Sequence, residues 1–253
     1  MKVEKVYFQN SRGQKLCGIL SVPEFSRIVV VMCHGRWTHK DRPSVRELSD
    51  ELNKNGVSTL RFDFTGHGES QGSVEEITVS DAVDDVKSAV NFVYEMFDKL
   101  FLFGNSFGGA AALAYAAKDD RVLLLVLKAP VSSYSEKFEN EFGQEGINKW
   151  KEQGYIEYSV EEKTYRVPYK FYQDSIKYNY NVYDYINISV LIVHGNKDEN
   201  VPVNQSLELV KHLKNGKLEI VKGADHRFTN KQHFDKSIKL TVSWLLKELK
   251  KIE

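Results

Sequence analysis

The sequence lacks a cysteine framework and a net charge. Its 253 residues contain two cysteines, Cys17 and Cys33, and 35 basic against 35 acidic side chains. Two cysteines are too few for a disulfide network or a four-cysteine zinc site, so we expect buried free thiols, which suit a reducing compartment. A chain without net charge has no long-range field that would attract nucleic acid or an anionic membrane.

Long apolar runs are also missing. No stretch approaches the roughly 18 consecutive apolar residues of a membrane span. The first ten residues, MKVEKVYFQN, lack the continuous apolar segment of a signal peptide. We therefore expect a cytoplasmic protein that acts on a small molecule, with no membrane span and no nucleic-acid partner. Its oligomeric state stays open, and a homodimer is one alternative.

Strand and helix patterns alternate after an opening hairpin around Arg12 and Gly13. This order predicts an α/β fold in which a mostly parallel sheet carries helices on both faces. The expected strands are 2–8, 15–20, 28–34, 57–64, 100–104, 122–129, 190–195 and 217–221. The expected helices are 44–55, 78–97, 106–117, 204–213 and 232–250.

The chain changes character after Pro130. Ten of the 13 tyrosines lie between Tyr134 and Tyr185, in a polar and aromatic stretch without a long apolar strand. About 55 residues are too many for a simple connection between a strand and the next element. We therefore predict one α/β core, residues 1–130 and 186–253, with an inserted cap or lid over residues 131–185.

A Gly-x-Ser-x-Gly pattern, Gly104 to Gly108, lies between an expected strand and an expected helix. A serine on such a tight turn exposes its hydroxyl above the edge of the sheet, and the glycines let neighbouring backbone approach. The helix behind the turn directs its N-terminus at developing negative charge. Ser106 is therefore the candidate nucleophile; the alternative is a serine that merely caps the helix.

A serine nucleophile needs a base and an acid that orients it, in the chain order serine, acid, base. His226 follows the last expected strand and is the candidate base. Asp198 follows the strand that ends at Gly195 and is the candidate acid, with Glu199 as the alternative. Asp225 adjoins the base too closely in sequence to turn behind its ring.

The oxyanion of the reaction needs two backbone N–H donors. Phe107 follows the nucleophile, and Arg36 follows the His34–Gly35 turn, so their amides are the candidates. The side chain of Arg36 either binds a substrate carboxylate or points to solvent. His67 lies between two glycines in Asp63–Ser70, where we expect a structural loop below the nucleophile.

Together these residues resemble the α/β-hydrolase superfamily, and in particular the lid-bearing cinnamoyl and feruloyl esterases. The resemblance rests on RFDFTGHGESQGS at 61–73, on His34–Gly35, on KGADHRF at 222–228 and on an insertion after Ala129–Pro130. It implies a triad of Ser106, His226 and Asp198, oxyanion amides at Arg36 and Phe107, and a cap that forms the substrate pocket. It also implies no metal and no cofactor. In this pocket Trp37 is expected to line the acyl site and Tyr172 to face the substrate.

The predicted function is that of a serine carboxylesterase acting on short-chain or aromatic, cinnamoyl-type, acyl esters. A serine peptidase or amidase, a monoacylglycerol lipase and an acyltransferase use the same triad and stay open as alternatives. A non-catalytic small-molecule receptor on a hydrolase scaffold is the alternative from another class. Ser106 argues against dehalogenase and epoxide-hydrolase chemistry, because both need a carboxylate in place of the serine on this strand-to-helix turn, the nucleophile elbow.

Overall fold

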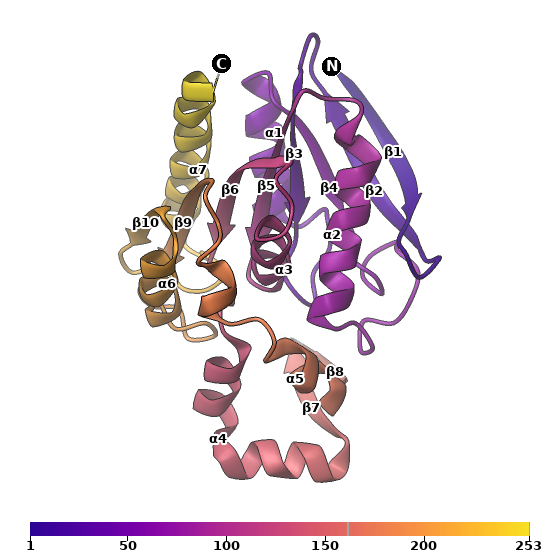
Figure 1. Cartoon of the computed structure of the whole chain (residues 1–253), viewed down its shortest axis with the longest axis vertical. Coiled ribbons are helices and arrows are strands. Elements are labelled where there is room, and N and C mark those ends of the chain that lie inside the picture. The colour runs from indigo at the N-terminus through magenta and orange to yellow at the C-terminus, as the bar shows by residue number, and fades with distance from the viewer. Residues whose placement is uncertain (161, 253) are drawn as a thin grey trace.

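A computed structural model of the chain describes residues 1–160 and 162–252, and its main element is an eight-stranded sheet (Figure 1). The strand order is β1-β2-β4-β3-β5-β6-β9-β10. β2 pairs antiparallel with both β1 and β4, and all the other pairs are parallel. The strands are β1 Lys2–Gln9, β2 Lys15–Val22, β3 Ile28–Cys33, β4 Ser58–Phe62, β5 Lys99–Asn105, β6 Val122–Lys128, β9 Ser189–Gly195 and β10 Asn215–Val221.

Helices cover both faces of this sheet, as the alternating pattern predicts. The helices of the core are α1 Pro43–Lys54, α2 Val79–Tyr94, α3 Phe107–Ala116, α6 Asn204–Leu209, followed by the short η2 Val210–His212, and α7 Lys231–Ile252. Alternate residues of each central strand enter different apolar clusters: Leu100 and Leu102 of β5 pack with α2 and α3, whereas Phe101 and Phe103 pack with α1 and α7. Such a two-sided core explains why the central strands are apolar without interruption.

The insertion, residues 131–185, connects β6 to β9 and lies beyond one end of the sheet (Figure 1). It contains α4 Tyr134–Gln153, the antiparallel hairpin of β7 Tyr155–Val160 and β8 Lys163–Pro168, α5 Tyr169–Ser175 and η1 Tyr180–Tyr183. The sequence patterns do not predict this hairpin, because its strands are polar and short. In β7 the half-buried residues alternate with exposed ones, so only one face of the hairpin is covered.

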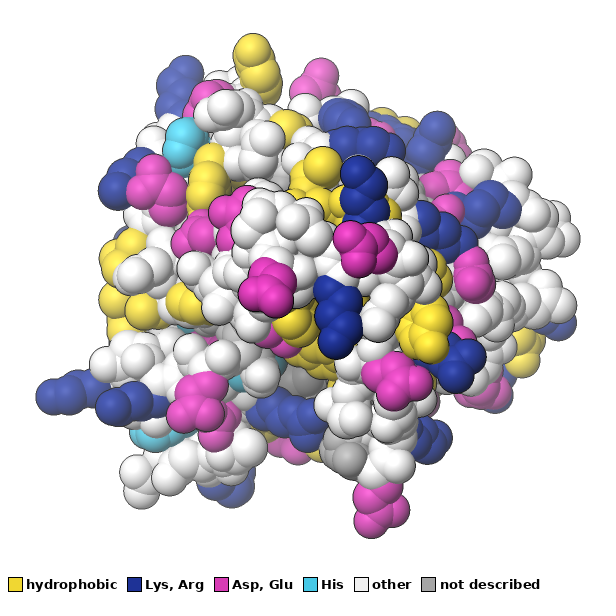
Figure 2. Space-filling model, turned by 90° about the horizontal axis from the view of Figure 1, so that it is seen from below, with side chains coloured by type: hydrophobic (Ala, Val, Ile, Leu, Met, Phe, Trp, Pro, Cys, Tyr) yellow, Lys and Arg dark blue, Asp and Glu magenta, His cyan; other side chains and the backbone are white. Residues whose placement is uncertain are grey.

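Figure 2 looks onto the insertion and shows basic and acidic side chains interspersed over this face. The mixture agrees with the equal numbers of the two kinds of charge in the sequence. None of the helices in residues 1–160 and 162–252 is both long enough and apolar enough to span a bilayer.

Candidate active site

Ser106 occupies the sharp turn between β5 and α3, with φ +53° and ψ −114°. A positive φ is rare for a residue with a side chain, and here the turn holds it in place: the Ser106 amide donates to the Lys128 carbonyl at 3.0 Å. Close approach explains the glycines. A Cβ on Gly104 would lie 2.6 Å from the Gly108 carbonyl oxygen, and one on Gly108 would lie 2.3 Å from the His34 carbonyl oxygen. The backbone turn therefore requires glycine at both positions.

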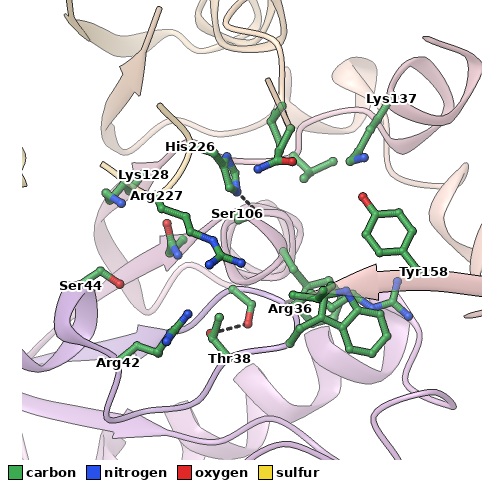
Figure 3. Close-up of a pocket in the computed structure, with 18 of the residues that line it drawn as sticks. Arg36, Thr38, Arg42, Ser44, Ser106, Lys128, Lys137, Tyr158, His226 and Arg227 are labelled. Atoms are coloured by element: carbon green, nitrogen blue, oxygen red, sulfur yellow. Dashed lines mark hydrogen bonds between the residues drawn. The ribbon is translucent and has the colours of Figure 1, made fainter. Parts of the chain in front are cut away.

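The structure brings Ser106, His226 and Asp198 into one hydrogen-bonded line, and Figure 3 shows the bond between Ser106 and His226. His226 Nε2 lies 3.0 Å from Ser106 Oγ, and His226 Nδ1 lies 2.7 Å from Asp198 Oδ2. Asp198 follows β9 and His226 follows β10, and these strands are parallel neighbours, so both loops meet at the carboxyl end of the sheet. The arrangement can accept a proton from the serine and hold the imidazole in one tautomer.

The Asp198 carboxylate is buried and fully engaged. It accepts the amides of Asn200 and Val201 at 2.9 and 2.8 Å, and the His194 ring nitrogen lies 3.0 Å away. Burial alone would raise the pKa of this carboxyl group, but the hydrogen bonds from His194 and His226 outweigh burial and hold its pKa well below the usual range. Asp198 is therefore ionised at neutral pH.

Two other carboxylates belong to the same loops: Glu199, the alternative acid, and Asp225, which adjoins the base. Glu199 is exposed, and the Asp225 carboxylate accepts the amide of Thr229 at 3.0 Å. Of the three carboxylates in these two loops, only Asp198 hydrogen-bonds the His226 ring among the described residues.

Two backbone amides beside Ser106, those of Arg36 and Phe107, have no hydrogen-bond acceptor among the described residues. Phe107 begins α3, so its N–H has no acceptor inside the helix. The His34–Gly35 turn runs close to the nucleophile, since a Cβ on Gly35 would lie 3.6 Å from the Ser106 Cβ. Within residues 1–160 and 162–252, neither the Phe107 nor the Arg36 amide donates a backbone hydrogen bond. These donors suit an oxyanion hole beside Ser106.

A cavity of about 1000 Å³ opens above Ser106, between the core and the insertion. Trp37 lines it and stacks on Tyr165 of β8, with ring centroids 4.0 Å apart. The part of the wall that the insertion supplies is mostly apolar or aromatic: Val131, Tyr134, Phe138, Phe142, Ile156, Tyr158, Val160 and Val167. The half-buried residues of β7 therefore face the cavity.

The structure corrects the expected position of Tyr172. Tyr172 is not among the residues that line the cavity. Its ring packs instead inside the insertion, 5.5 Å from Tyr169 and 5.8 Å from Trp150 between centroids. Tyr158 of β7 lines the cavity wall where Tyr172 was expected. The only sequence signal for Tyr158 is the alternation of apolar and polar residues along the short strand β7.

The sequence patterns do not identify two further residues of the site, His194 and Lys128. His194 lies near the end of β9, where its Nε2 contacts Asp198 and its Nδ1 lies 2.6 Å from Ser206 Oγ. Lys128 ends β6 and lines the cavity although it is 4% exposed. Burial lowers the pKa of Lys128 to about 8. The signal for Lys128 was a charged residue at the end of an otherwise apolar strand.

His67 has the structural contacts expected of it. Its Nδ1 lies 3.0 Å from the Thr65 carbonyl oxygen, and the Trp37 amide donates to its Nε2 at 3.3 Å. Burial lowers the pKa of His67 to about 3, so the ring is neutral. His67 therefore supports the loop that carries Trp37 and does not contact Ser106.

One group of residues has the composition of a metal site. The Sγ of Cys17 and carboxylate oxygens of Asp63 and Glu69 lie within 4.8 Å of one another. The ammonium group of Lys40 already bonds to both carboxylates, at 2.8 and 2.7 Å. A lysine thus supplies the positive charge in this cluster, which makes it a poor site for a cation.

Comparisons with known proteins agree with this geometry. Residues 25–167 match the family described as "Serine aminopeptidase, S33". Est1E from Butyrivibrio proteoclasticus, solved with ferulic acid bound, has a TM-score of 0.85 at 23% identity and covers 96% of this chain and 99% of its own. The structure of mouse alpha/beta hydrolase domain-containing protein 10 gives 0.82 at 22% identity, covering 97% and 99%. These likenesses establish the α/β-hydrolase fold.

Relatives of known name match this chain over only part of its length and of theirs. The mouse mitochondrial palmitoyl-protein thioesterase ABHD10 is 26% identical over 193 residues, which cover 70% of this chain and 61% of that protein. Thiohydrolase aneE from Aspergillus aculeatus is 31% identical over 132 residues, which cover 50% of this chain and 41% of that protein. The chain thus spans less than two thirds of the length of each of these relatives.

Proposed function

Because the chain belongs to the serine aminopeptidase S33 family of α/β-hydrolases, we propose that it hydrolyses carboxylic esters through an acyl-enzyme formed on Ser106. The observation that carries the proposal is the unbroken line of hydrogen bonds from Ser106 through His226 to Asp198. A serine hydroxyl that merely capped α3 would not need an imidazole at 3.0 Å, and Ser106 makes no cap hydrogen bond.

The reaction follows from the positions of these groups. Ser106 Oγ attacks the ester carbonyl carbon while His226 Nε2 takes its proton, and the ionised Asp198 stabilises the resulting imidazolium. The amides of Arg36 and Phe107 stabilise the oxyanion; loss of one such donor costs about 3 to 4 kcal/mol of barrier in measured cases. His226 then protonates the departing alcohol, and a water activated by His226 hydrolyses the acyl-enzyme.

The cavity supports an aromatic or short acyl group as substrate. Trp37 and Phe107 flank the oxyanion amides, and the insertion adds Tyr134, Phe138 and Tyr158 to the wall. Aromatic side chains give large, rigid contact surfaces to a planar ligand. We propose that the insertion acts as the cap of this pocket and selects the acyl group. The location of the protein in a reducing cytoplasm stays a prediction.

Thioester hydrolysis is the second candidate. Two curated relatives are named as a thioesterase and a thiohydrolase, and the same attack on a carbonyl carbon serves both bonds. A thiolate leaves more readily than an alkoxide. A His226 that can protonate the departing alcohol of an ester is therefore also sufficient for release of the thiol from a thioester. Amide hydrolysis asks more of His226, because the leaving amine must be protonated.

The test is hydrolysis of p-nitrophenyl esters from acetate to palmitate, of methyl ferulate and of matched acyl thioesters, by the wild type and Ser106→Ala. We expect turnover by the wild type and a loss of at least about 1000-fold in kcat in the variant, since the nucleophile of a triad is indispensable. Equal activity of Ser106→Ala, or an inert wild type, would contradict the proposal. Ser135→Ala, which removes a serine of α4 outside the cavity wall, is the matched control.

A further inference from the structure

Arg36 carries a positive charge on the cavity wall without a counter-ion. Its Nε and Nη2 atoms are buried and have no hydrogen-bond partner, and no ion pair joins its guanidinium to another described residue. Buried guanidinium groups are normally paired, because an unpaired buried charge and unpaired N–H groups are costly. Burial lowers the pKa of Arg36 to about 10, so the group stays protonated at neutral pH.

Aromatic rings surround the guanidinium of Arg36. Its Cζ lies 3.8 Å from the Phe171 ring centroid, 4.5 Å from that of Trp37 and 6.0 Å from that of Phe107. Rings of this kind stabilise a cation over their faces but accept no in-plane N–H bonds. Such packing fixes the group in one orientation and leaves its Nε and Nη2 groups unpaired, and a carboxylate that displaced the atoms covering them would fit this edge in a bidentate manner.

The nearest polar neighbours do not supply that anion. Tyr134 and Tyr158 are the two side chains whose charge would favour protonated Arg36. Burial raises the pKa of both phenols, that of Tyr158 to about 12, so both are neutral hydroxyl groups at pH 7. Glu141 is already bonded to Lys137. The wall near Arg36 thus offers neutral hydroxyl groups and one unpaired cation.

The position of Arg36 relates it to the acyl part of a substrate. The leaving group must lie beside His226, which protonates it. In Figure 3, Arg36 and Tyr158 lie on one side of Ser106, whereas Lys128 and Arg227 lie on the other side. Arg36 also borders Phe107, the residue after the nucleophile, and Trp37. A carbonyl carbon held at Ser106 with its leaving group at His226 therefore directs its acyl chain towards the insertion and Arg36.

From this geometry we propose that Arg36 binds a carboxylate at the far end of the acyl group, so that the substrates are half-esters or half-thioesters of dicarboxylic acids. The proposal rests on the hydrolytic function proposed above and narrows its substrate class. Hydrolysis of such a half-ester by water yields the alcohol or thiol and a free dicarboxylic acid. The side chain of Arg36 thereby has a role separate from that of its backbone amide.

The experiment compares two substrates that differ at one end only, monoethyl adipate and ethyl hexanoate, in which a methyl group replaces the carboxylate. Hydrogen bonds to a charged group contribute enough to give the wild type a kcat/KM about 10- to 100-fold higher for the half-ester. Arg36→Met should bring the ratio of the two kcat/KM values close to one. Measuring a ratio within each variant cancels any effect of the substitution on the oxyanion amide.

Arg166→Met is the matched control, because Arg166 also lies over an aromatic ring, 4.9 Å from Tyr155, but does not line the cavity. Its ratio should equal that of the wild type. Arg36→Lys, which keeps the charge and loses the planar fork, replaces Arg36→Met if that variant does not fold, and its ratio should fall below the wild-type value. A wild-type ratio of one or less, or an unchanged ratio in Arg36→Met, overturns the proposal and leaves Arg36 a packing residue.

Binding separates this proposal from the hydrolytic function. If the wild type hydrolyses neither ester, calorimetric titration of Ser106→Ala with both esters still decides the role of Arg36. Tighter binding of monoethyl adipate by about tenfold or more, lost in Ser106→Ala/Arg36→Met, supports the anion site while the esterase function fails. Equal affinities for the two esters contradict it.

Discussion

Lys128 places an ammonium group in surroundings that favour its neutral form. Its Nζ lies 4.2 Å from the Phe228 ring centroid, and the residue is 4% exposed. Asp198 and Asp225 favour the charged form, but burial outweighs them and lowers the pKa of Lys128 to about 8. At neutral pH the folded protein therefore holds a charge at an energetic disadvantage.

Replacing Lys128 by methionine should raise the free energy of unfolding at pH 7. Below pH 8 the lysine is protonated in both states, so the wild type bears the full penalty of burying the charge. Between pH 8 and 10.5 the unfolded chain holds more protons than the folded one, so wild-type stability rises with pH by up to about 3 kcal/mol. The gain from Lys128→Met should shrink accordingly.

Urea unfolding at pH 7 and pH 9.5 measures this difference, with Lys87→Met on the exposed side of α2 as the control. The control should change stability equally at both pH values. A gain from Lys128→Met that is the same at pH 7 and 9.5 would mean that the buried amine does not titrate in this range.

At the scale of elements, the junction of β5 and α3 depends on two glycines. A Cβ on Gly108 would lie 2.3 Å from the His34 carbonyl oxygen and 2.4 Å from that of Cys33, and both oxygens belong to rigid backbone. Gly108→Ala should therefore lower the free energy of unfolding by about 3 kcal/mol or more and displace Ser106. Gly13→Ala, at a φ of +75° with open space around it, should cost only about 1 kcal/mol.

Chemical denaturation and the reactivity of Ser106 with a fluorophosphonate probe together test this expectation. The Gly108 variant should lose both stability and labelling, whereas the Gly13 variant should keep its labelling. Full labelling of Gly108→Ala would show that the backbone can move aside and that the elbow does not require glycine there.

Sequence patterns predicted the core elements better than the insertion. Strands such as β3 and β5 are apolar throughout because both faces are buried, and α2 begins at a Thr78 capping box that the sequence displays. The hairpin of β7 and β8 has no comparable signal. Its residues are half-exposed, and the cavity they face appears only once the fold is assembled.

The same limit applies to the site. Ser106, Asp198 and His226 stand at strand ends in the order of a known architecture, so local context was enough to select them. Whether Arg36 reached solvent depended on Phe171, which is 135 positions away in the sequence and covers its guanidinium. Contacts between such distant residues carry no local pattern. The expected position of Tyr172 also depended on contacts that the sequence does not display. Its neighbour Phe171 packs against Arg36, whereas the Tyr172 ring packs against Trp150 and Tyr169.

At the scale of the whole molecule, polar bonds supplement the apolar cluster that the insertion shares with the core. The Asp174 carboxylate of α5 accepts the Ser80 amide at 2.8 Å and the Ser80 hydroxyl at 2.6 Å, at the first turn of α2. Charge-assisted bonds of this kind each contribute about 1.5 to 3 kcal/mol. They fix the side of the insertion that carries Phe171.

Asp174→Ala should loosen the insertion without unfolding the core. We expect at least tenfold faster proteolytic cleavage within residues 131–185, with the sheet intact, because local opening becomes easier by about 1.5 kcal/mol or more. Asp120→Ala, at an exposed position after α3, should cleave at the wild-type rate. Cleavage spread evenly over core and insertion would indicate global unfolding and contradict this role.

Trp37 and Tyr165 form the stack that joins the core loop after β3 to β8 of the insertion, with ring planes 21° apart. The other tryptophans, Trp150 and Trp244, are buried at 0% and 8% exposure, away from this junction. Indole emission depends on what lies against the ring, so with Trp150 and Trp244 changed to phenylalanine the remaining tryptophan would report the junction alone. The stack thus provides an optical signal of any movement of the insertion relative to the core, which stopped-flow fluorescence can follow without attaching a dye.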